Sequence, residues 1–96
     1  MGSESFMEQA TGKTAKEAFQ SLVGDAQYDF GHSGYTGTIA EKNSFVMIDL
    51  PDGMDAEDYA DILMDKDDER IADKWGDAGC IKVKDGEFLF FGWASS

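Results

Sequence analysis

The dipeptide Asp85-Gly86 separates two apolar runs, "CIKVK" and "EFLFFGW", and restricts the fold more than any other feature of the sequence. Asp-Gly between such runs is among the strongest short signals of a two-residue hairpin turn. This turn predicts four cross-strand pairs: Lys84 with Glu87, Val83 with Phe88, Lys82 with Leu89, and Ile81 with Phe90. In this register the core face of the hairpin carries Ile81, Val83, Phe88 and Phe90.

The other face of the predicted hairpin is charged near the turn and strongly apolar at the far end, where Leu89, Phe91 and Trp93 lie. Either a helix covers this apolar end or it is exposed. Exposed apolar patches commonly mark interfaces. Phe91 and Trp93 are therefore candidate partner-binding residues, and a homodimer through the C-terminal hairpin is one form that such an interface can take.

The segment "TAKEAFQSLVGDAQYDF" predicts a helix over residues 14–29. Thr14 and Glu17 form a capping-box pattern, in which side chains satisfy free backbone N–H groups at the start of a helix. Apolar residues then recur at intervals of three and four, which places them on one helical face. Gly31 is a natural helix stop.

The rest of the chain predicts strands over 4–11 and 44–50 and a second helix capped by Asp55. It also predicts a third short helix that starts at Asp67 or Asp68 and uses Ile71, Ala72 and Trp75. The run at 44–50 is apolar without clean alternation, which favours a central strand covered on both faces. The predicted order is β-α-β-α-α-β-β. We therefore expect an α+β fold in which a small mixed sheet of about four strands, ending in the C-terminal hairpin, packs with two to three helices.

Length and charge limit the functional classes. A chain of 96 residues is expected to form a single domain, residues 1–96. Its 20 acidic residues against 8 basic ones give a formal net charge of −12. Such a surface repels phosphate backbones and anionic membranes, so we expect no direct nucleic-acid or membrane binding and a basic protein as partner. No apolar stretch resembles a signal peptide or a membrane span, and we expect a cytoplasmic protein.

The stretch "GHSGYTGTIAEK", residues 31–42, carries three evenly spaced glycines and the only histidine. It follows a predicted helix, whereas a phosphate-binding loop precedes one, so a nucleotide-phosphate loop is disfavoured. The segment is either a tight connector or a binding loop for a small polar ligand or a protein. The candidate ligand-binding residues are His32, Ser33, Gly34, Tyr35, Thr36, Gly37, Thr38 and Lys42. A catalytic centre at His32 is a further alternative, although no triad can be argued from spacing.

Eleven acidic residues lie between Asp49 and Asp73, opposed only by Lys66 and Arg70. The stretch from Asp65 to Gly76 fails as a calcium loop, because Arg70 stands where glycine is needed and Gly76 where a glutamate is needed. The block is either a solvated helix face or a negative surface that docks on a basic protein. The candidate partner-binding residues in it are Asp55, Asp58, Asp61, Asp65 and Asp68.

Cys80 is the single cysteine, which excludes an internal disulfide and a multi-thiolate metal site. Its place beside an apolar run predicts a small buried core residue. We expect no cofactor and no metal.

The stretches "GHSGYTGTIAEK" and "KWGDAGCIKVKDGEFLFFGWASS" resemble small uncharacterised proteins of bacteria and their phages. The resemblance implies a bacterial or phage cytoplasmic setting and carries no activity or site residue. We therefore expect a small acidic, non-enzymatic binding protein that modulates or inhibits a basic host protein, such as one that itself binds nucleic acid. The alternatives are a small-molecule or nucleotide binder using residues 31–42, and an enzyme centred on His32.

Overall fold

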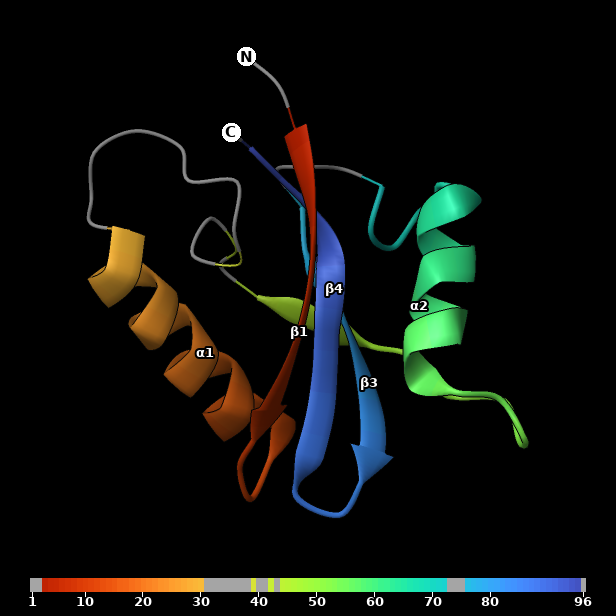
Figure 1. Cartoon of the computed structure of the whole chain (residues 1–96), viewed down its shortest axis with the longest axis horizontal. Helices are drawn as coiled ribbons and strands as arrows, with labels where there is room; N and C mark the ends of the chain where they lie inside the picture. Colours follow the sequence, from red (N-terminus) through yellow and green to blue (C-terminus); the bar gives the residue numbers. More distant parts are fainter. Residues whose placement is uncertain (1–2, 31–38, 40–41, 43, 73–75, 96) are drawn as a thin grey trace.

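A four-stranded sheet runs through the middle of the protein, with one helix on each of its faces (Figure 1). The structure is a computed structural model that describes residues 3–30, 39, 42, 44–72 and 76–95, with the backbone alone at 3, 26–30 and 95. Its elements, in chain order, are β1 (Ser3–Thr11), α1 (Ala15–Phe30), β2 (Phe45–Met47), α2 (Ala56–Asp65), β3 (Ala78–Lys84) and β4 (Glu87–Ser95).

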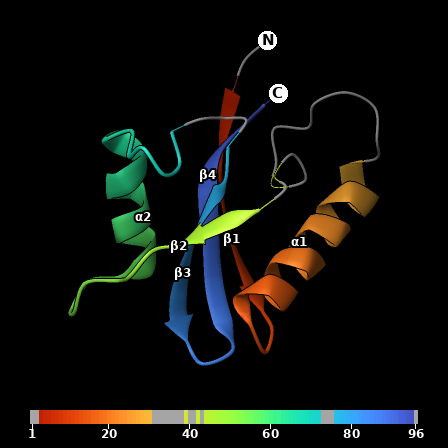
Figure 2. The same cartoon turned by 180° about the vertical axis from the view of Figure 1, so that it is seen from behind.

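The strands are arranged in the order β1-β4-β3-β2, so the last strand of the chain lies inside the sheet and the first lies at its edge. β4 is antiparallel to both β1 and β3, whereas β2 is parallel to β3. Figure 2 shows β2 at the edge opposite β1, with the two helices on opposite sides of the sheet. The predicted α+β class, mixed sheet and C-terminal hairpin are confirmed.

Helix α1 begins where the capping pattern predicts. The backbone N–H of Glu17 donates to Thr14 Oγ1 at 3.2 Å, and the Glu17 carboxylate accepts from the Lys13 N–H at 3.2 Å. Two N–H groups that the helix cannot satisfy itself thereby find acceptors. Ala18 and Phe19 are buried against the sheet, which anchors the first turns of α1.

Helix α2 begins at its predicted cap, where Asp55 Oδ2 accepts from the N–H groups of Glu57 and Asp58 at 3.1 and 3.3 Å. It ends in a Schellman motif: the Asp68 N–H donates to Leu63 O and the Asp67 N–H to Met64 O. Asp67 occupies the left-handed position of this motif, with φ of 52°.

The predicted third helix is not formed in the described residues that follow α2. The left-handed Asp67 turns the chain away from the helix axis, and residues 66–71 form turns. Ile71 N–H and Ala72 N–H both donate to the Asp68 carbonyl, which closes the turn. Of the residues expected in that helix, Ile71 is buried, Ala72 is exposed, and Trp75 lies outside the described residues.

The hairpin register is correct only at its tip. Lys84 pairs with Glu87 as predicted, but a bulge between Lys82 and Lys84 shifts every later pair by one residue. Ile81 therefore pairs with Leu89 instead of Phe90 and lies on the opposite face of the sheet from Phe90. The predicted shared core face is wrong, and Val83 is 37% exposed rather than buried.

The turn itself accounts for the bulge. Gly86 has φ of +81°, whereas Asp85 keeps a negative φ. The two-residue turns whose twist matches the flanking strands, types I′ and II′, both need positive φ at the first turn position, which Asp85 lacks. A bulge adds one residue and increases the local strand twist, which compensates for the mismatch.

Strand β4 supplies both faces of the core. Phe88 and Phe90 pack with Phe6, Phe19 and Cys80 under α1. Leu89 and Phe91 pack with Ile81, Leu63 and Met64 under α2. On the α1 face the rings of Phe19, Phe45 and Phe90 lie 5.1–5.6 Å apart, centroid to centroid, which joins α1, β2 and β4.

The apolar run at 44–50 does not form a central strand. β2 spans three residues, pairs only with β3 and lies at the sheet edge, where Met47 is 48% exposed. Its apolar residues pack on opposite faces of the sheet. Phe45 packs with the apolar cluster beneath α1, and Val46 and Ile48 pack with the cluster beneath α2. Burial of a short segment on both faces thus accounts for the lack of alternation.

Phe90→Ala and Val83→Ala test the bulged register as a pair. Phe90 is fully buried, so removing its ring is expected to lower the free energy of unfolding by about 3–5 kcal/mol. Val83 is partly exposed at the bulge, and its truncation is expected to cost about 0.5 kcal/mol or less. Urea unfolding measures both. Equal losses in the two variants would contradict the bulge.

Asp67→Gly is expected to stabilise the protein. A non-glycine residue in the left-handed region costs about 1–2 kcal/mol, and glycine recovers part of this despite its greater freedom in the unfolded chain. We expect a gain of about 0.5–1 kcal/mol in urea unfolding. Asp65→Gly, which places glycine in the last turn of α2, is the control and should destabilise. A loss of stability in Asp67→Gly would contradict the described end of α2.

Candidate functional site

The predicted ligand-binding loop is described at only two positions. Residues 32–38, which hold seven of the eight candidates, lie outside the described residues. Ile39 is fully buried in the α1 cluster, and the Lys42 N–H donates to its carbonyl at 2.9 Å. Ile39 and Lys42 are therefore fixed in the protein, whereas a binding role for the loop and a catalytic role for His32 remain predictions.

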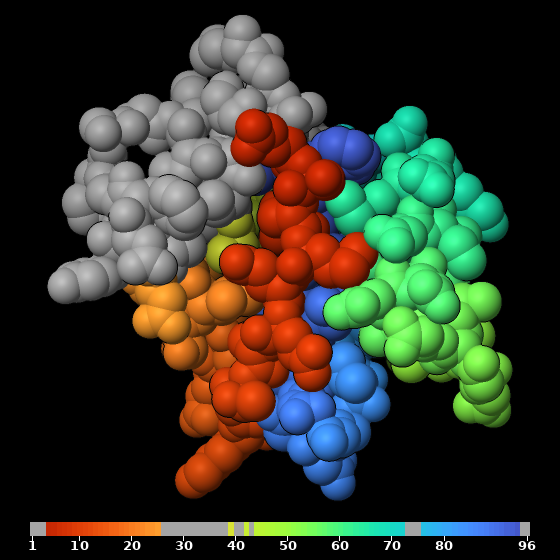
Figure 3. Space-filling view, viewed as in Figure 1, coloured from red at the N-terminus to blue at the C-terminus, as the bar shows by residue number. Residues whose placement is uncertain are grey.

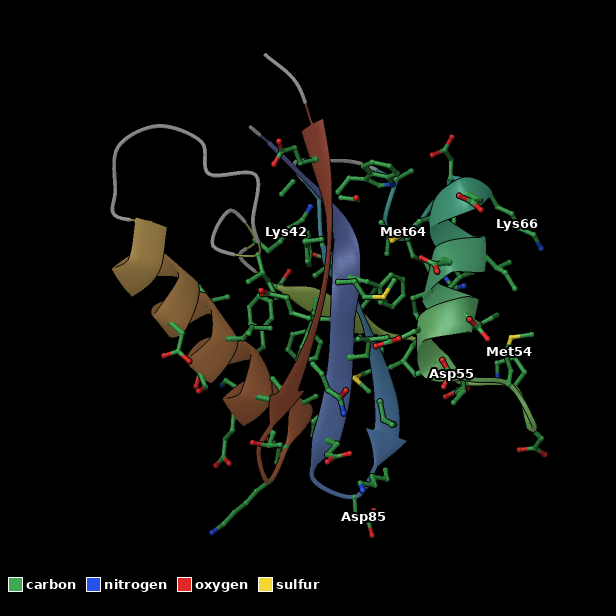
Figure 4. All side chains as sticks on the ribbon, in the orientation of Figure 1. Lys42, Met54, Asp55, Met64, Lys66 and Asp85 are labelled. Carbon is green, nitrogen blue, oxygen red and sulfur yellow. The ribbon has the colours of Figure 1, made fainter. Side chains whose placement is uncertain are left out.

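Lys42 was predicted to contact a ligand, but its side chain is built into the protein. It is 3% exposed, and its Nζ donates to the Gly76 carbonyl at 3.0 Å. Figure 4 shows the side chain inside the molecule, beside the sheet. A buried ammonium needs polar partners to offset the loss of water. Its bond to Gly76 ties the start of the β2 segment to the start of the β3 segment.

The acids of α2 point away from the core. Asp58, Asp61 and Asp65 are exposed and recur at intervals of three and four, so they follow one helical face. The buried side of α2 carries Ala56, Ala60, Leu63 and Met64. We call Asp58, Asp61 and Asp65 the acidic ridge, which runs about 10 Å along the outer side of α2.

Two apolar side chains flank the acidic ridge. Ile62 lies on the same outward face of α2 and is 36% exposed, and Met54, just before the helix, is 37% exposed. Figure 4 shows Met54 and Asp55 at the start of α2 and Lys66 at its end. The outer side of α2 therefore offers both negative charge and apolar surface.

The other two predicted acids are engaged within the chain. Asp55 is exposed, but its carboxylate caps α2. Asp68 binds Arg70 through two side-chain contacts of 2.9 Å and also accepts the Arg70 N–H at 3.0 Å. Hydrogen bonding to the Arg70 side chain, and to a smaller extent to the Arg70 backbone N–H, lowers the pKa of Asp68 to about 2. Its charge is thus paired with a neighbouring guanidinium, whereas the three ridge acids make no ion pair with any described residue.

The aromatic candidates do not form an exposed patch. Phe91 is fully buried beneath α2, so its predicted role as a partner-contacting residue is not compatible with this surface. Trp93 is half-buried and packs against the same cluster. Its Nε1–H is buried, and no described residue accepts a hydrogen bond from it. Of the two outcomes predicted for this end of the hairpin, covering by a helix is the one observed.

The predicted dimer through the hairpin would find only a short unpaired strand edge in the hairpin. β4 lies between β1 and β3, and β2 pairs with the first part of β3 up to Cys80. Only residues 81–84 of β3 lack a neighbouring strand on that side in the described part of the chain. The dimer stays a prediction, and this short stretch is the backbone edge the hairpin can offer.

A hollow of about 330 Å³ lies between the end of β1 and the middle of α1. It is lined by Gln9, Ala10, Thr11, Ser21, Leu22 and Asp25. Its polar groups are an amide, two hydroxyls and one carboxylate, and it opens to solvent. Strand and helix positions far apart in the chain meet there, so no local sequence pattern marks these residues as neighbours.

Across the described residues, no group of three histidine, cysteine, aspartate or glutamate side chains is placed to hold a metal ion. Neither of the described helices is long and apolar enough to cross a membrane. Comparisons with protein-family models, with curated proteins and with solved structures found no match to this chain.

Cys80 is expected to be inert in the folded protein. It is fully buried, and burial raises the pKa of its thiol from 9.0 to about 12. A thiol-reactive dye at pH 8 should therefore label the native protein far more slowly than the urea-unfolded chain. Because the folded state holds this proton more tightly, stability should also fall as pH rises from about 9 towards 12. Equal labelling rates in the two states would contradict the buried position.

Proposed function

We propose that this chain is a small non-enzymatic binding protein that engages a basic host protein through the acidic ridge and thereby modulates or inhibits it. The observation that carries the proposal is the outward row of Asp58, Asp61 and Asp65, with Ile62 exposed among them. A partner of this kind carries lysine and arginine around an apolar spot that accepts Ile62. A host protein that binds nucleic acid has such a surface.

The arrangement of charge supports docking over simple solubility. A magnitude of about 2–8 suffices to keep a small domain in solution, and this chain carries a formal −12. Like charges gathered on one helix repel each other and lower stability. A basic partner removes that repulsion on binding, and the ridge also raises the rate of encounter.

The apolar residues beside the ridge support a protein partner in particular. Protein interfaces combine an apolar centre with a polar rim, and charged residues are depleted at the centre. Ile62 and Met54 supply exposed apolar area next to the acids. The opposite side of α2 is packed on the sheet through Ala60 and Leu63, so the ridge is presented by a fixed element. Little ordering cost then opposes binding.

The triple variant Asp58→Asn, Asp61→Asn, Asp65→Asn tests the proposal. We expect it to lose affinity for the captured partner by about tenfold or more, because the charges that face the partner are removed. Capture from bacterial lysate at low salt, identification of the bound protein and titration with the purified partner measure this. Binding of the unaltered chain should weaken strongly as the Debye length falls from about 10 Å at 0.1 M to about 3 Å at 1 M salt.

The matched control is Asp49→Asn, Asp52→Asn, Asp85→Asn, which changes the net charge equally at exposed positions outside α2. It should keep affinity within about threefold. Circular dichroism and urea unfolding show that both variants are folded. Equal losses in the two variants, or a captured partner that is acidic, would contradict a role for the ridge.

A further inference from the structure

Strand β1 is a long and regular edge strand with an open side. Its nine residues pair with β4 without a register shift, from Ser3 opposite Ser95 to Thr11 opposite Glu87. No strand lies on its other side in the described sheet. Figure 3 shows β1 running across the front of the molecule, uncovered between α1 and α2.

The ladder shows which backbone groups point outward. The Gly12 N–H donates to the Gly86 carbonyl at 3.1 Å, one step beyond the pair Thr11 and Glu87. Hydrogen-bonded and non-bonded pairs alternate in an antiparallel ladder. Even-numbered residues of β1 therefore bond to β4, and Ser5, Met7 and Gln9 present their N–H and C=O groups to the open side. From Ser5 to Gln9 these groups span about 13 Å.

Natural edge strands are protected from further pairing by prolines, bulges, short length or charge. β1 has no proline and no bulge, and it is longer than a typical strand. Its protection is charge: Glu4 and Glu8 are exposed on the side that faces α1, where Phe6 is buried. These carboxylates repel an acidic strand, including that of a second copy with net charge −12, but attract lysine and arginine.

The hollow between β1 and α1 lies on the same face of the sheet as Glu4 and Glu8, next to the open edge of β1. A strand added to β1 would place the side chains opposite Glu8 and Ala10 towards α1, where Asp25 lines the hollow. Asp25 makes no ion pair with any residue of the described chain. A space of about 330 Å³ with a carboxylate in its wall accommodates one long cationic side chain.

We propose that the open edge of β1 binds an extended basic segment of a partner protein by strand addition. Its backbone pairs with Ser5, Met7 and Gln9, a lysine or arginine lies opposite Glu8, and the next residue on that face reaches Asp25. This surface is separate from the acidic ridge, which lies on the outer side of α2 on the other face of the sheet (Figures 1 and 3). The two proposals share only the sign of the partner's charge and can fail separately.

The probe is a short peptide of alternating lysine and threonine, as long as β1, and the control peptide has glutamate in place of lysine. Amide hydrogen exchange and NMR shifts are followed on the full chain. With the lysine peptide, exchange of the Ser5, Met7 and Gln9 amides should slow by about tenfold or more, because their N–H groups become bonded. The amide of Asp25 should shift. The glutamate peptide should change neither.

Gln9→Pro removes one outward N–H without breaking the ladder to β4, a position where edge strands tolerate proline. It should lower the affinity for the lysine peptide by about tenfold or more. Gln9→Ala keeps the N–H but loses the weak side-chain bond to Glu87, and should bind within about twofold. Glu8→Lys, an exposed change that leaves the backbone intact, should also weaken binding by about tenfold.

Several results would overturn this proposal. The proposal fails if the lysine peptide does not bind or if Gln9→Pro binds it as tightly as the unaltered chain. It also fails if the NMR shifts are centred on Asp58–Asp65 instead of β1. A dimer of the free protein with protected Ser5, Met7 and Gln9 amides would show that a second copy occupies the edge. The triple Asn variant of the ridge should bind the lysine peptide as the unaltered chain does. Loss of that binding would assign the peptide to the ridge.

Discussion

Strand β4 is buried on both of its faces, and the positions of both helices follow from this burial. Phe88 and Phe90 require a cover on one side, and Leu89 and Phe91 on the other, so neither helix alone can complete the core. Each ring of this size contributes several kcal/mol when fully buried. The contact is tight enough that a Cβ at Gly79 would lie 2.6 Å from the Phe91 ring, so only glycine fits beneath that ring. The position of α2, and hence of its acids, follows from the need to cover Leu89 and Phe91.

This layered arrangement determines where charge can be placed. Both faces of the sheet are covered, so the described acids lie on the outer sides of the helices, in turns and loops, on the edge strand and, for Glu87, at the turn end of β4. On α2 the inward residues are small or apolar, and the outward positions hold the ridge. On β1 the charges lie at the open edge, where they also limit unwanted strand pairing. The two proposed surfaces thus use positions that the core leaves available.

The features predicted correctly from the sequence are those set by local chemistry. Thr14 with Glu17, Asp55, and Asp85-Gly86 mark two helix starts and one turn through side-chain or backbone preferences of a few residues. Two features could not be predicted because they depend on conformations the residue types do not specify. The bulge at Val83 depends on a negative φ at Asp85, and the end of α2 depends on a left-handed aspartate at Asp67, where glycine is usual. The pairing of β1 with β4 joins the two ends of the chain, and no local pattern encodes it.

In the candidate site, too, local spacing predicts some features, whereas others depend on the tertiary structure. Helical spacing alone places Asp58, Asp61 and Asp65 opposite the buried stripe, and the structure agrees. The pairing of Asp68 with Arg70 depends on the turn after α2, and the burial of Phe91 depends on where α2 packs. The open edge of β1 depends on strand order, which single-sequence patterns do not determine.

We propose that charge on the outer side of α2 brings a basic protein to this chain. Stopped-flow kinetics with the captured partner, over a range of salt concentrations, tests it most directly. We expect an association rate constant that falls by about tenfold or more between 0.05 M and 0.5 M salt, while the dissociation rate constant changes much less. An association rate that does not depend on salt would contradict electrostatic recruitment through this surface.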